Sequence, residues 1–348
     1  MRQRSDSELR QREELKNESS CIQESGPLPT VNHDQGNRKH AILTGGRKTK
    51  AIVQEEYGSP DDVLELKDID EPVAKDDEVL VCVHAAAVHI SDWVFVRGVP
   101  YIMRPMIGLL RPKISVPGQD IAGKVEAVGK KVRQLRPGDE VFGWCKGAFA
   151  EYACAGEDNF VPKPANLTFE QAAAVGVSAV TALQALRDQG RVQSGQKVLI
   201  NGASGGVGPF AVQIAMAFGA DVTGVCSTRN VDVVRSIGAD QVIDHTQEDL
   251  TKSGQRYDFI LDNVANHSLS DLRRVLTPEG MLQPNGGGHS SNRWIGPMGS
   301  VIKANVLSVL VHQQGRTFIA TYNKEDLQFL KELIEAGKIT PVIDRTYP

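Results

Sequence analysis

The stretch KVLINGASGGVGPFAVQIAMAFGADVTGVCSTR, from Lys197 to Arg229, decides the fold of this 348-residue chain. Its first five residues form a short apolar run that is typical of a buried parallel strand. A glycine-rich turn follows, and apolar residues then recur at helical spacing as far as Phe218. Gly219 is placed to end that helix, and Asp221 begins a second apolar run. The stretch therefore predicts a strand, a turn, a helix and a second strand.

The turn between the strand and the helix has the features of a phosphate-binding loop. Gly205 leaves room for a pyrophosphate to approach the backbone, and Gly208 allows the helix to pack closely on the strand. The free N–H groups of the first helical turn, together with the helix dipole, attract an anion. Ala203 stands where the first glycine of the G-x-G-x-x-G pattern is usually found. The alternative interpretation is a tight turn that holds no ligand.

The residues after the second strand bear on which nucleotide the turn would hold. In folds that bind NAD, an acidic side chain about 20 residues after the glycines reads the ribose 2′-hydroxyl. That place holds Ser227, Thr228 and Arg229, two hydroxyls and a guanidinium that suit a 2′-phosphate. This pattern predicts NADP(H). The alternative is that Arg229 only caps or solvates the next helix.

The composition is that of an ordinary soluble globular protein, with 41% hydrophobic and 24% charged residues. A formal net charge of −4 implies neither a nucleic acid nor an anionic membrane as partner. No apolar run is long enough to span a membrane. The five cysteines are scattered and form no C-x-x-C pair, which argues against a disulfide framework or a zinc knuckle. We therefore expect a protein of a reducing compartment, the cytoplasm.

The chain divides by composition into an arm, two domains and a short tail. Residues 1–48 are polar, of mixed charge and free of aromatic side chains, so we expect a disordered arm. Residues 49–170 hold short apolar strands punctuated by proline and glycine, which predicts a compact β-barrel. Residues 171–340 alternate strand and helix patterns, which predicts a doubly wound parallel sheet and hence an α/β fold. Residues 341–348 form the tail, which we expect to be a truncated return of the chain to the catalytic domain.

With both patterns placed, the chain resembles the medium-chain dehydrogenase/reductase superfamily, and within it the zinc-independent quinone oxidoreductases. The resemblance covers about Lys50 to Pro348. It is carried by the glycines and valines of Gly123–Val141, and by the run from Gly195 through the glycine-rich turn to Gln213. It implies a GroES-like barrel joined to a Rossmann domain, with NADPH in the cleft and a small electrophilic substrate. The resemblance is also compatible with a homodimer.

The residues that hold zinc in the alcohol dehydrogenases of this superfamily are replaced here. Their C-x-[ST]-D motif corresponds to HISD at His89–Asp92, and their Gly-His-Glu motif corresponds to GQD at Gly118–Asp120. His89 and Asp120 remain as two candidate ligands, without the softer ligands that zinc prefers. No catalytic metal is therefore expected. A zinc alcohol dehydrogenase is the disfavoured alternative.

Without a metal, the resemblance implies direct hydride transfer from the nicotinamide to a quinone, enal or enone. Asp92 resembles the family's residue near the nicotinamide, and the candidate proton donor is Tyr101 or an ordered water. The alternative for Asp92 is a buried structural carboxylate that is hydrogen-bonded to the backbone. We interpret His84 and His89 as barrel histidines without a catalytic role.

The resemblance also implies which residues contact NADPH. They are Ser204, Gly205, Gly206, Val207 and Gly208 at the phosphates, Ser227 and Arg229 at the 2′-phosphate, His245 near the adenosine, and Asn263, Gly286, Gly287 and Gly288 on the nicotinamide side.

Two features depart from the family pattern. Pro284 falls in the last predicted strand of the parallel sheet, where it removes a ladder donor. The sequence stops at Pro348, where relatives continue with one more helix and strand, and we expect this stop to leave apolar barrel surface uncovered. These departures keep open an alternative function from another class, a nucleotide-binding scaffold or assembly protein without turnover.

Overall fold

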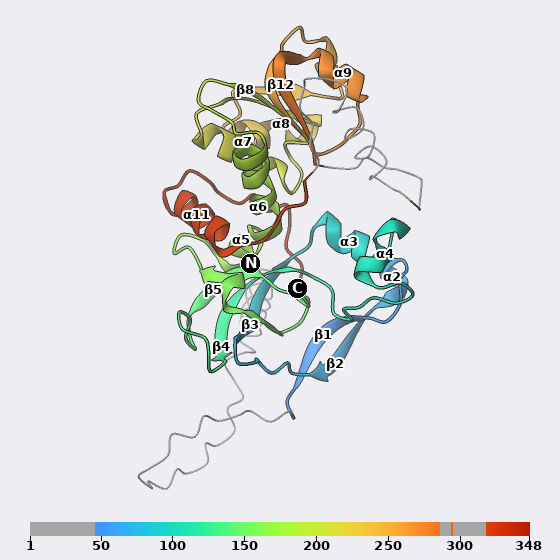
Figure 1. Cartoon of the computed structure of the whole chain (residues 1–348), viewed down its shortest axis with the longest axis vertical. Helices are drawn as coiled ribbons and strands as arrows, with labels where there is room; N and C mark the ends of the chain where they lie inside the picture. The colour runs from blue at the N-terminus through green and yellow to red at the C-terminus, as the bar shows by residue number, and fades with distance from the viewer. Residues whose placement is uncertain (1–45, 286–293, 295–317) are drawn as a thin grey trace, which may run out of the picture. The chain divides into compact units, whose positions relative to one another are not determined.

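The structure is a computed structural model, and it describes residues 46–285, 294 and 318–348 (Figure 1). The predicted arm as far as residue 45, and the predicted cofactor residues Gly286, Gly287 and Gly288, lie outside these ranges. Three sheets are present in the described part of the chain. No helix in it has the length and apolar character needed to cross a membrane.

The barrel half consists of a two-stranded ribbon and a five-stranded antiparallel sheet of order β6-β3-β4-β5-β7. The ribbon pairs β1 (Lys48–Gln54) with β2 (Leu64–Asp70). The larger sheet contains β3 (Glu78–Ala87), β4 (Asp120–Val128), β5 (Glu140–Trp144), β6 (Tyr152–Gly156) and β7 (Phe160–Pro162). Inward-facing residues such as Val79, Val81 and Ile121 are fully buried. The predicted barrel of short apolar strands is therefore confirmed.

Short helices connect the barrel strands. They are α2 (Pro60–Val63), α3 (Ile90–Arg97), η1 (Tyr101–Met103), α4 (Arg104–Ile107) and η2 (Glu157–Asn159). Val63 is the last residue of α2 and is buried. Gly98 ends α3 in the left-handed conformation, with φ of +60°.

The second half is a five-stranded parallel sheet of order β10-β9-β8-β11-β12. Its strands are β8 (Lys197–Asn201), β9 (Asp221–Cys226), β10 (Gln241–Asp244), β11 (Tyr257–Asp262) and β12 (Leu276–Pro284). The apolar run that opens the decisive stretch is β8, the central strand, and it is buried from Val198 to Asn201. Because the chain winds to both sides of β8, the sheet has its topological switch point at the carboxyl end of this strand.

Helices pack against this sheet (Figure 1). They are α7 (Gly208–Ala217), α8 (Val231–Ser236) and α9 (Leu269–Arg274), with the 3₁₀ turns η4 (Thr228–Asn230) and η5 (Leu250–Lys252). The alanine-rich segment before β8 forms two helices, α5 (Phe169–Ala173) and α6 (Gly176–Gln184), followed by a π-helical turn, η3 (Ala185–Gln189). The last helix is α11 (Lys324–Glu335).

Pro284 is compatible with the sheet because of where it lies. It is the last residue of β12, opposite Asp262 of β11, and β12 is an edge among the strands that the structure describes. A proline at this position removes no hydrogen bond from the interior of the ladder. The departure seen in the sequence is thus accommodated at a strand end.

Candidate active site

The glycine-rich turn connects β8 to α7, as the sequence predicted. Gly208 starts α7 so close to the turn that a Cβ atom there would lie 2.2 Å from the carbonyl oxygen of Gly202. Such a contact with backbone cannot be relieved by a side-chain rotation. Gly208 therefore permits the close approach of helix and strand that the sequence analysis assigned to it.

Gly205 and Gly206 have a different environment. Both are exposed, and a Cβ atom on Gly205 would meet only the Gly202 carbonyl oxygen, at an ordinary contact distance of 3.5 Å. A Cβ atom on Gly206 would lie 3.2 Å from the Ser178 hydroxyl, the end of a rotatable side chain. Neither residue has a positive φ. Since neither packing nor backbone conformation requires glycine at position 205, the open surface over the turn suits a ligand that approaches the backbone.

Asn230 joins the two predicted phosphate-binding segments, and the sequence analysis did not identify it. Its amide Nδ2 donates to the hydroxyl of Ser204, at 2.9 Å, and to that of Ser227, at 3.4 Å. Arg229 is exposed and lies in the same 3₁₀ turn. Asn230 therefore links Ser204 to Ser227, and Arg229 directly precedes Asn230 in the chain. The only signal in the sequence was an asparagine directly after the hydroxyl-rich stretch.

A carboxylate from another strand lies beside this segment, although the stretch Cys226–Arg229 itself contains none. Asp244 ends β10 and pairs in register with Cys226 at the end of β9. Its carboxylate accepts from the Thr228 hydroxyl at 2.6 Å, and this hydrogen bond lowers the pKa of Asp244. His245 follows, exposed, with its backbone N–H donating to the Cys226 carbonyl. The pairing of the parallel strands β9 and β10 thus brings Thr228 and Asp244 together, although they are far apart in the sequence.

Polar side chains also line the carboxyl ends of β8 and β11. Asn201 donates to Asp262 at 2.8 Å and to Asn266 at 2.9 Å. Asn263, a predicted nicotinamide contact, donates from its backbone and its side chain to the Asn201 carbonyl oxygen, at 3.1 Å in both cases. Asn285 in turn donates to the Asn263 side chain at 2.7 Å. Asn263 is thus held rigidly at the switch point.

On the barrel side, Asp92 is buried at the start of α3. Its Oδ2 atom accepts from the His89 backbone N–H at 3.0 Å, as the structural interpretation of this carboxylate anticipated. The same oxygen lies 3.7 Å from Nε2 of His89, and an Asp120 oxygen lies 3.9 Å from that nitrogen. Oδ1 of Asp92 and Nε2 of His89 are both buried without a hydrogen-bond partner among the described residues. Two carboxyl groups and an imidazole therefore face one another across a small gap.

A chain of hydrogen bonds fixes the ring of His89. Trp144 donates to the Gln119 carbonyl at 3.3 Å, and Gln119 donates to the Ser91 hydroxyl at 3.1 Å. The Ser91 oxygen lies 2.6 Å from Nδ1 of His89. If the Ser91 hydroxyl donates to Nδ1, the ring hydrogen lies on Nε2 and faces the two carboxyl groups.

Burial governs the ionisation of this cluster. It lowers the pKa of His89, which favours the neutral ring, and the Asp92 charge opposes this effect only in part. Burial raises the pKa of Asp92, against the influence of His89 and of its backbone hydrogen bond. Burial likewise raises the pKa of Asp120 well above its usual value. Burial therefore shifts the pKa of each of these three groups in the direction of its uncharged form.

Asp120 links the barrel to the first helices of the second half. It lies on β4, and both of its carboxylate oxygens accept from the backbone N–H of Val177, at 3.0 and 2.9 Å. Val177 is in the first turn of α6, whose dipole favours a negative charge at that end. The next residue, Ser178, is the one that approaches Gly206. A few residues of α6 thus connect the acid–histidine cluster to the glycine-rich turn.

Two aromatic residues complete this side of the site, and the sequence analysis missed both. Trp144 ends β5, and Tyr322 precedes α11; their rings stack with centroids 5.2 Å apart and planes inclined by 11°. Burial, with smaller contributions from the Asp120 and Asp92 carboxylates, raises the pKa of the Tyr322 phenol, so it stays protonated at neutral pH. No local motif marks Tyr322, because about 180 residues separate it from Trp144.

Tyr101, the predicted proton donor, contacts a different set of residues. Its ring lies 4.6 Å from the Arg104 guanidinium and edge-on to Trp294, with centroids 5.4 Å apart. His84 stacks on Phe169 with centroids 4.4 Å apart, and burial lowers its pKa. The structure thus joins Asp92 to His89 and Asp120, and joins Tyr101 to Arg104 and Trp294.

Among the described residues, the acidic groups that lie close to Nε2 of His89 are Asp92 and Asp120, at 3.7 and 3.9 Å. Catalytic zinc sites use three protein ligands, with an open fourth position. Within the described residues, no group of three His, Cys, Asp or Glu side chains is arranged to hold a metal ion. Gln119, in the position of the zinc histidine, directs its amide to Trp144 and Ser91.

Comparison with known proteins agrees with this architecture. Residues 75–165 match the family model described as alcohol dehydrogenase GroES-like domain. Residues 237–348 match the model described as zinc-binding dehydrogenase.

The chain is similar in sequence to quinone oxidoreductase from Sus scrofa, at 34% identity over 88% of this chain and 92% of the relative. It is also similar to 2-methylene-furan-3-one reductase from Solanum lycopersicum, at 33% identity over 86% of this chain and 72% of the relative. A solved structure of quinone oxidoreductase from Coxiella burnetii matches with a TM-score of 0.71 and 28% identity, over 86% of this chain and 91% of the other. The chain therefore belongs to the medium-chain dehydrogenase/reductase superfamily of NAD(P)H-dependent oxidoreductases, within its quinone oxidoreductase branch.

Proposed function

We propose that this protein is an NADPH-dependent, metal-free reductase that transfers hydride to a quinone or an α,β-unsaturated carbonyl compound. The observation that carries the proposal is the environment of Gly205, where an exposed glycine is required neither by packing nor by backbone conformation. A ligand that lies against the backbone explains that glycine. The names of the relatives, a quinone oxidoreductase and an enone reductase, support the choice of substrate class.

The residues around the turn have distinct proposed roles. The N–H groups from Ser204 to Gly208 would hold the pyrophosphate, Ser227 and Arg229 the 2′-phosphate, and Asn263 the nicotinamide side. When bound, the reduced nicotinamide supplies a hydride. For a quinone, hydride transfer to the ring system and proton transfer to oxygen together yield the hydroquinone. Asp92 would orient the reacting groups, and Tyr101 or an ordered water would supply the proton.

Preference for NADPH is the finer part of the proposal. Arg229 is exposed beside Ser227 and is free to approach a phosphate, which favours NADPH. Asp244 lies nearby, but the Thr228 hydroxyl donates to its carboxylate. We propose that the attraction between Arg229 and a 2′-phosphate outweighs the repulsion between that phosphate and the Asp244 carboxylate. Measuring the dissociation constants of NADPH and NADH by cofactor fluorescence tests this preference.

Turnover is tested by following NADPH oxidation optically with a panel of quinones and enones. The expected result is oxidation that depends on both the protein and the acceptor. Tight binding of NADPH without turnover of any acceptor would instead support a nucleotide-binding scaffold. Failure to bind either nucleotide would overturn both interpretations.

A further inference from the structure

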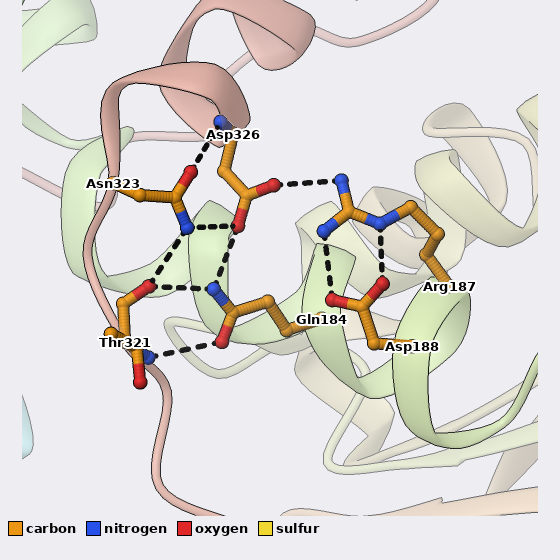
Figure 2. Close-up of polar contacts among 6 residues, drawn as sticks. All are labelled: Gln184, Arg187, Asp188, Thr321, Asn323 and Asp326. Carbon is orange, nitrogen blue, oxygen red and sulfur yellow. Dashed lines mark hydrogen bonds and ion pairs between the residues drawn. The ribbon is translucent and has the colours of Figure 1, made fainter.

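A cluster of polar side chains fastens the backbone directly before Tyr322 (Figure 2). Gln184, at the end of α6, donates from its amide nitrogen to the Thr321 carbonyl at 2.6 Å. Its amide oxygen accepts from the Thr321 backbone N–H at 3.0 Å. One buried side chain thus satisfies both backbone groups of Thr321, as a neighbouring strand would do.

The backbone after Tyr322 is fastened through Asp326. Asn323 caps α11 by accepting from the Asp326 N–H at 2.8 Å, and its amide donates to the Asp326 carboxylate at 3.0 Å (Figure 2). Gln184 donates to the same carboxylate at 2.7 Å, and Arg187 forms an ion pair with it, also at 2.7 Å. The side chain of Asp326 is only 4% exposed. We call Gln184, Arg187, Asn323 and Asp326 the polar clamp.

The polar clamp lies outside the hydrogen-bond network of His89 but is linked to it by a single side chain. Tyr322, fixed on both sides, stacks on Trp144. Trp144 donates to Gln119, which donates to Ser91, which contacts His89. The orientation of the indole therefore decides whether the Gln119 amide keeps the direction that Ser91 and His89 require.

We propose that the polar clamp positions Tyr322 against Trp144, and that Tyr322 is thereby a positioning residue for the His89–Asp92–Asp120 cluster. The proposal rests on the proposed function for its effect on turnover. The phenol ring acts by its fixed plane, which prevents the indole from rotating away from Gln119. The clamp residues contact none of the cluster directly in the described contacts, so their effect passes through Tyr322.

Tryptophan emission tests the positioning without any substrate. The sequence has three tryptophans, and replacing the exposed Trp93 and Trp294 by phenylalanine leaves Trp144 as the only reporter. In that background of the full chain, Tyr322→Leu removes the stacked ring and shifts the emission of Trp144. Gln184→Met removes both hydrogen bonds to Thr321 and is expected to produce the same shift. Tyr322→Phe keeps the ring and is expected to leave the emission unchanged.

Gln328→Met is the matched control, because Gln328 is an exposed glutamine of α11 outside the clamp. It is expected to leave the emission of Trp144 unchanged. If Gln184→Met fails to fold by circular dichroism, Asp326→Asn provides a near-isosteric second disruption of the clamp. The proposal is overturned if Tyr322→Leu leaves the emission unchanged, or if a folded clamp variant does so.

Steady-state kinetics tests the consequence for the reaction. Tyr322→Leu and the folded clamp variant are expected to lower kcat by about ten- to a hundredfold, with the dissociation constant of NADPH unchanged because the nucleotide binds at the glycine-rich turn. Tyr322→Phe, which keeps the ring, should retain the kcat of the unaltered protein. Equal losses in Phe and Leu variants would mean that the hydroxyl acts directly and would overturn the ring-positioning proposal. Absence of turnover in the unaltered protein would refute the proposed function, while the emission experiment would still decide the positioning.

Discussion

The glycine-rich turn and the His89 network are built in opposite ways. The turn is one continuous stretch, and its proposed ligand contacts come from backbone N–H groups that the absence of Cβ atoms leaves accessible. Its geometry therefore follows from the local sequence. The network is assembled from side chains at α3, β4, β5 and the segment before α11, together with a backbone N–H of α6. A single substitution in the turn should therefore change either cofactor binding or stability. A single substitution in the network should disturb several hydrogen bonds at once.

The largest effect should come from Arg229, the one cation predicted for the 2′-phosphate. We expect Arg229→Ala to weaken NADPH binding by about 1.5–3 kcal/mol, the range for hydrogen bonds to charged groups, with the lower end favoured by its exposure. NADH binding should stay nearly unchanged, which fluorescence titration with both cofactors measures. Arg235→Ala, at an exposed arginine of α8, is the control. Equal affinities of the unaltered protein for the two cofactors would contradict this assignment.

Two glycines of the turn separate packing from binding. We expect Gly208→Ala to lower the free energy of unfolding by about 1–3 kcal/mol, because its Cβ atom would collide with the backbone of Gly202. Gly205→Ala should change that free energy by no more than about 0.5 kcal/mol, since the space is open. It should nevertheless weaken NADPH binding. Urea denaturation and cofactor titration of both variants check this, and a stable Gly208→Ala variant would show that the turn tolerates more displacement than its geometry suggests.

A smaller effect is expected from the pH dependence of Asp326. Burial alone would raise its pKa, but the hydrogen bonds from Arg187, Gln184 and Asn323 outweigh burial and lower it. A lowered folded-state pKa means that this group stabilises the protein above the unfolded value of about 3.9. That stabilisation is lost as the pH falls through the folded-state pKa. In urea denaturation between pH 7 and pH 3, Asp326→Asn should therefore reduce the loss in free energy of unfolding as the pH falls. An unchanged pH dependence would show that the charge of Asp326 does not stabilise the protein.

Chelation should have the smallest effect, namely none. Gln119 occupies the position of the zinc histidine and is committed to Trp144 and Ser91. Dialysis against a strong chelator is expected to leave turnover unchanged. Stoichiometric zinc in the purified protein, together with loss of rate on its removal, would reverse the metal-free assignment.

The two regions also differ in how far sequence reasoning reached. The strands, the helix after the turn and the packing role of Gly208 could be inferred, because periodicity and glycine placement are local properties. Asp244 was missed because it joins Thr228 only through the pairing of β9 with β10. Tyr322 was missed for a similar reason, since its stacking on Trp144 depends on how the polar clamp fixes α11. Long-range register of this kind has no signature in a single sequence.

The hydrogen bonds from the Val177 N–H to the Asp120 carboxylate provide a way to measure how firmly β4 and α6 stay in contact. The Val177 amide hydrogen is held between two carboxylate oxygens of β4 while it belongs to the first turn of α6. The first N–H groups of a helix have no partner within the helix, so without Asp120 this hydrogen would exchange with solvent deuterium readily. Its exchange rate therefore measures how often β4 and the first turn of α6 separate.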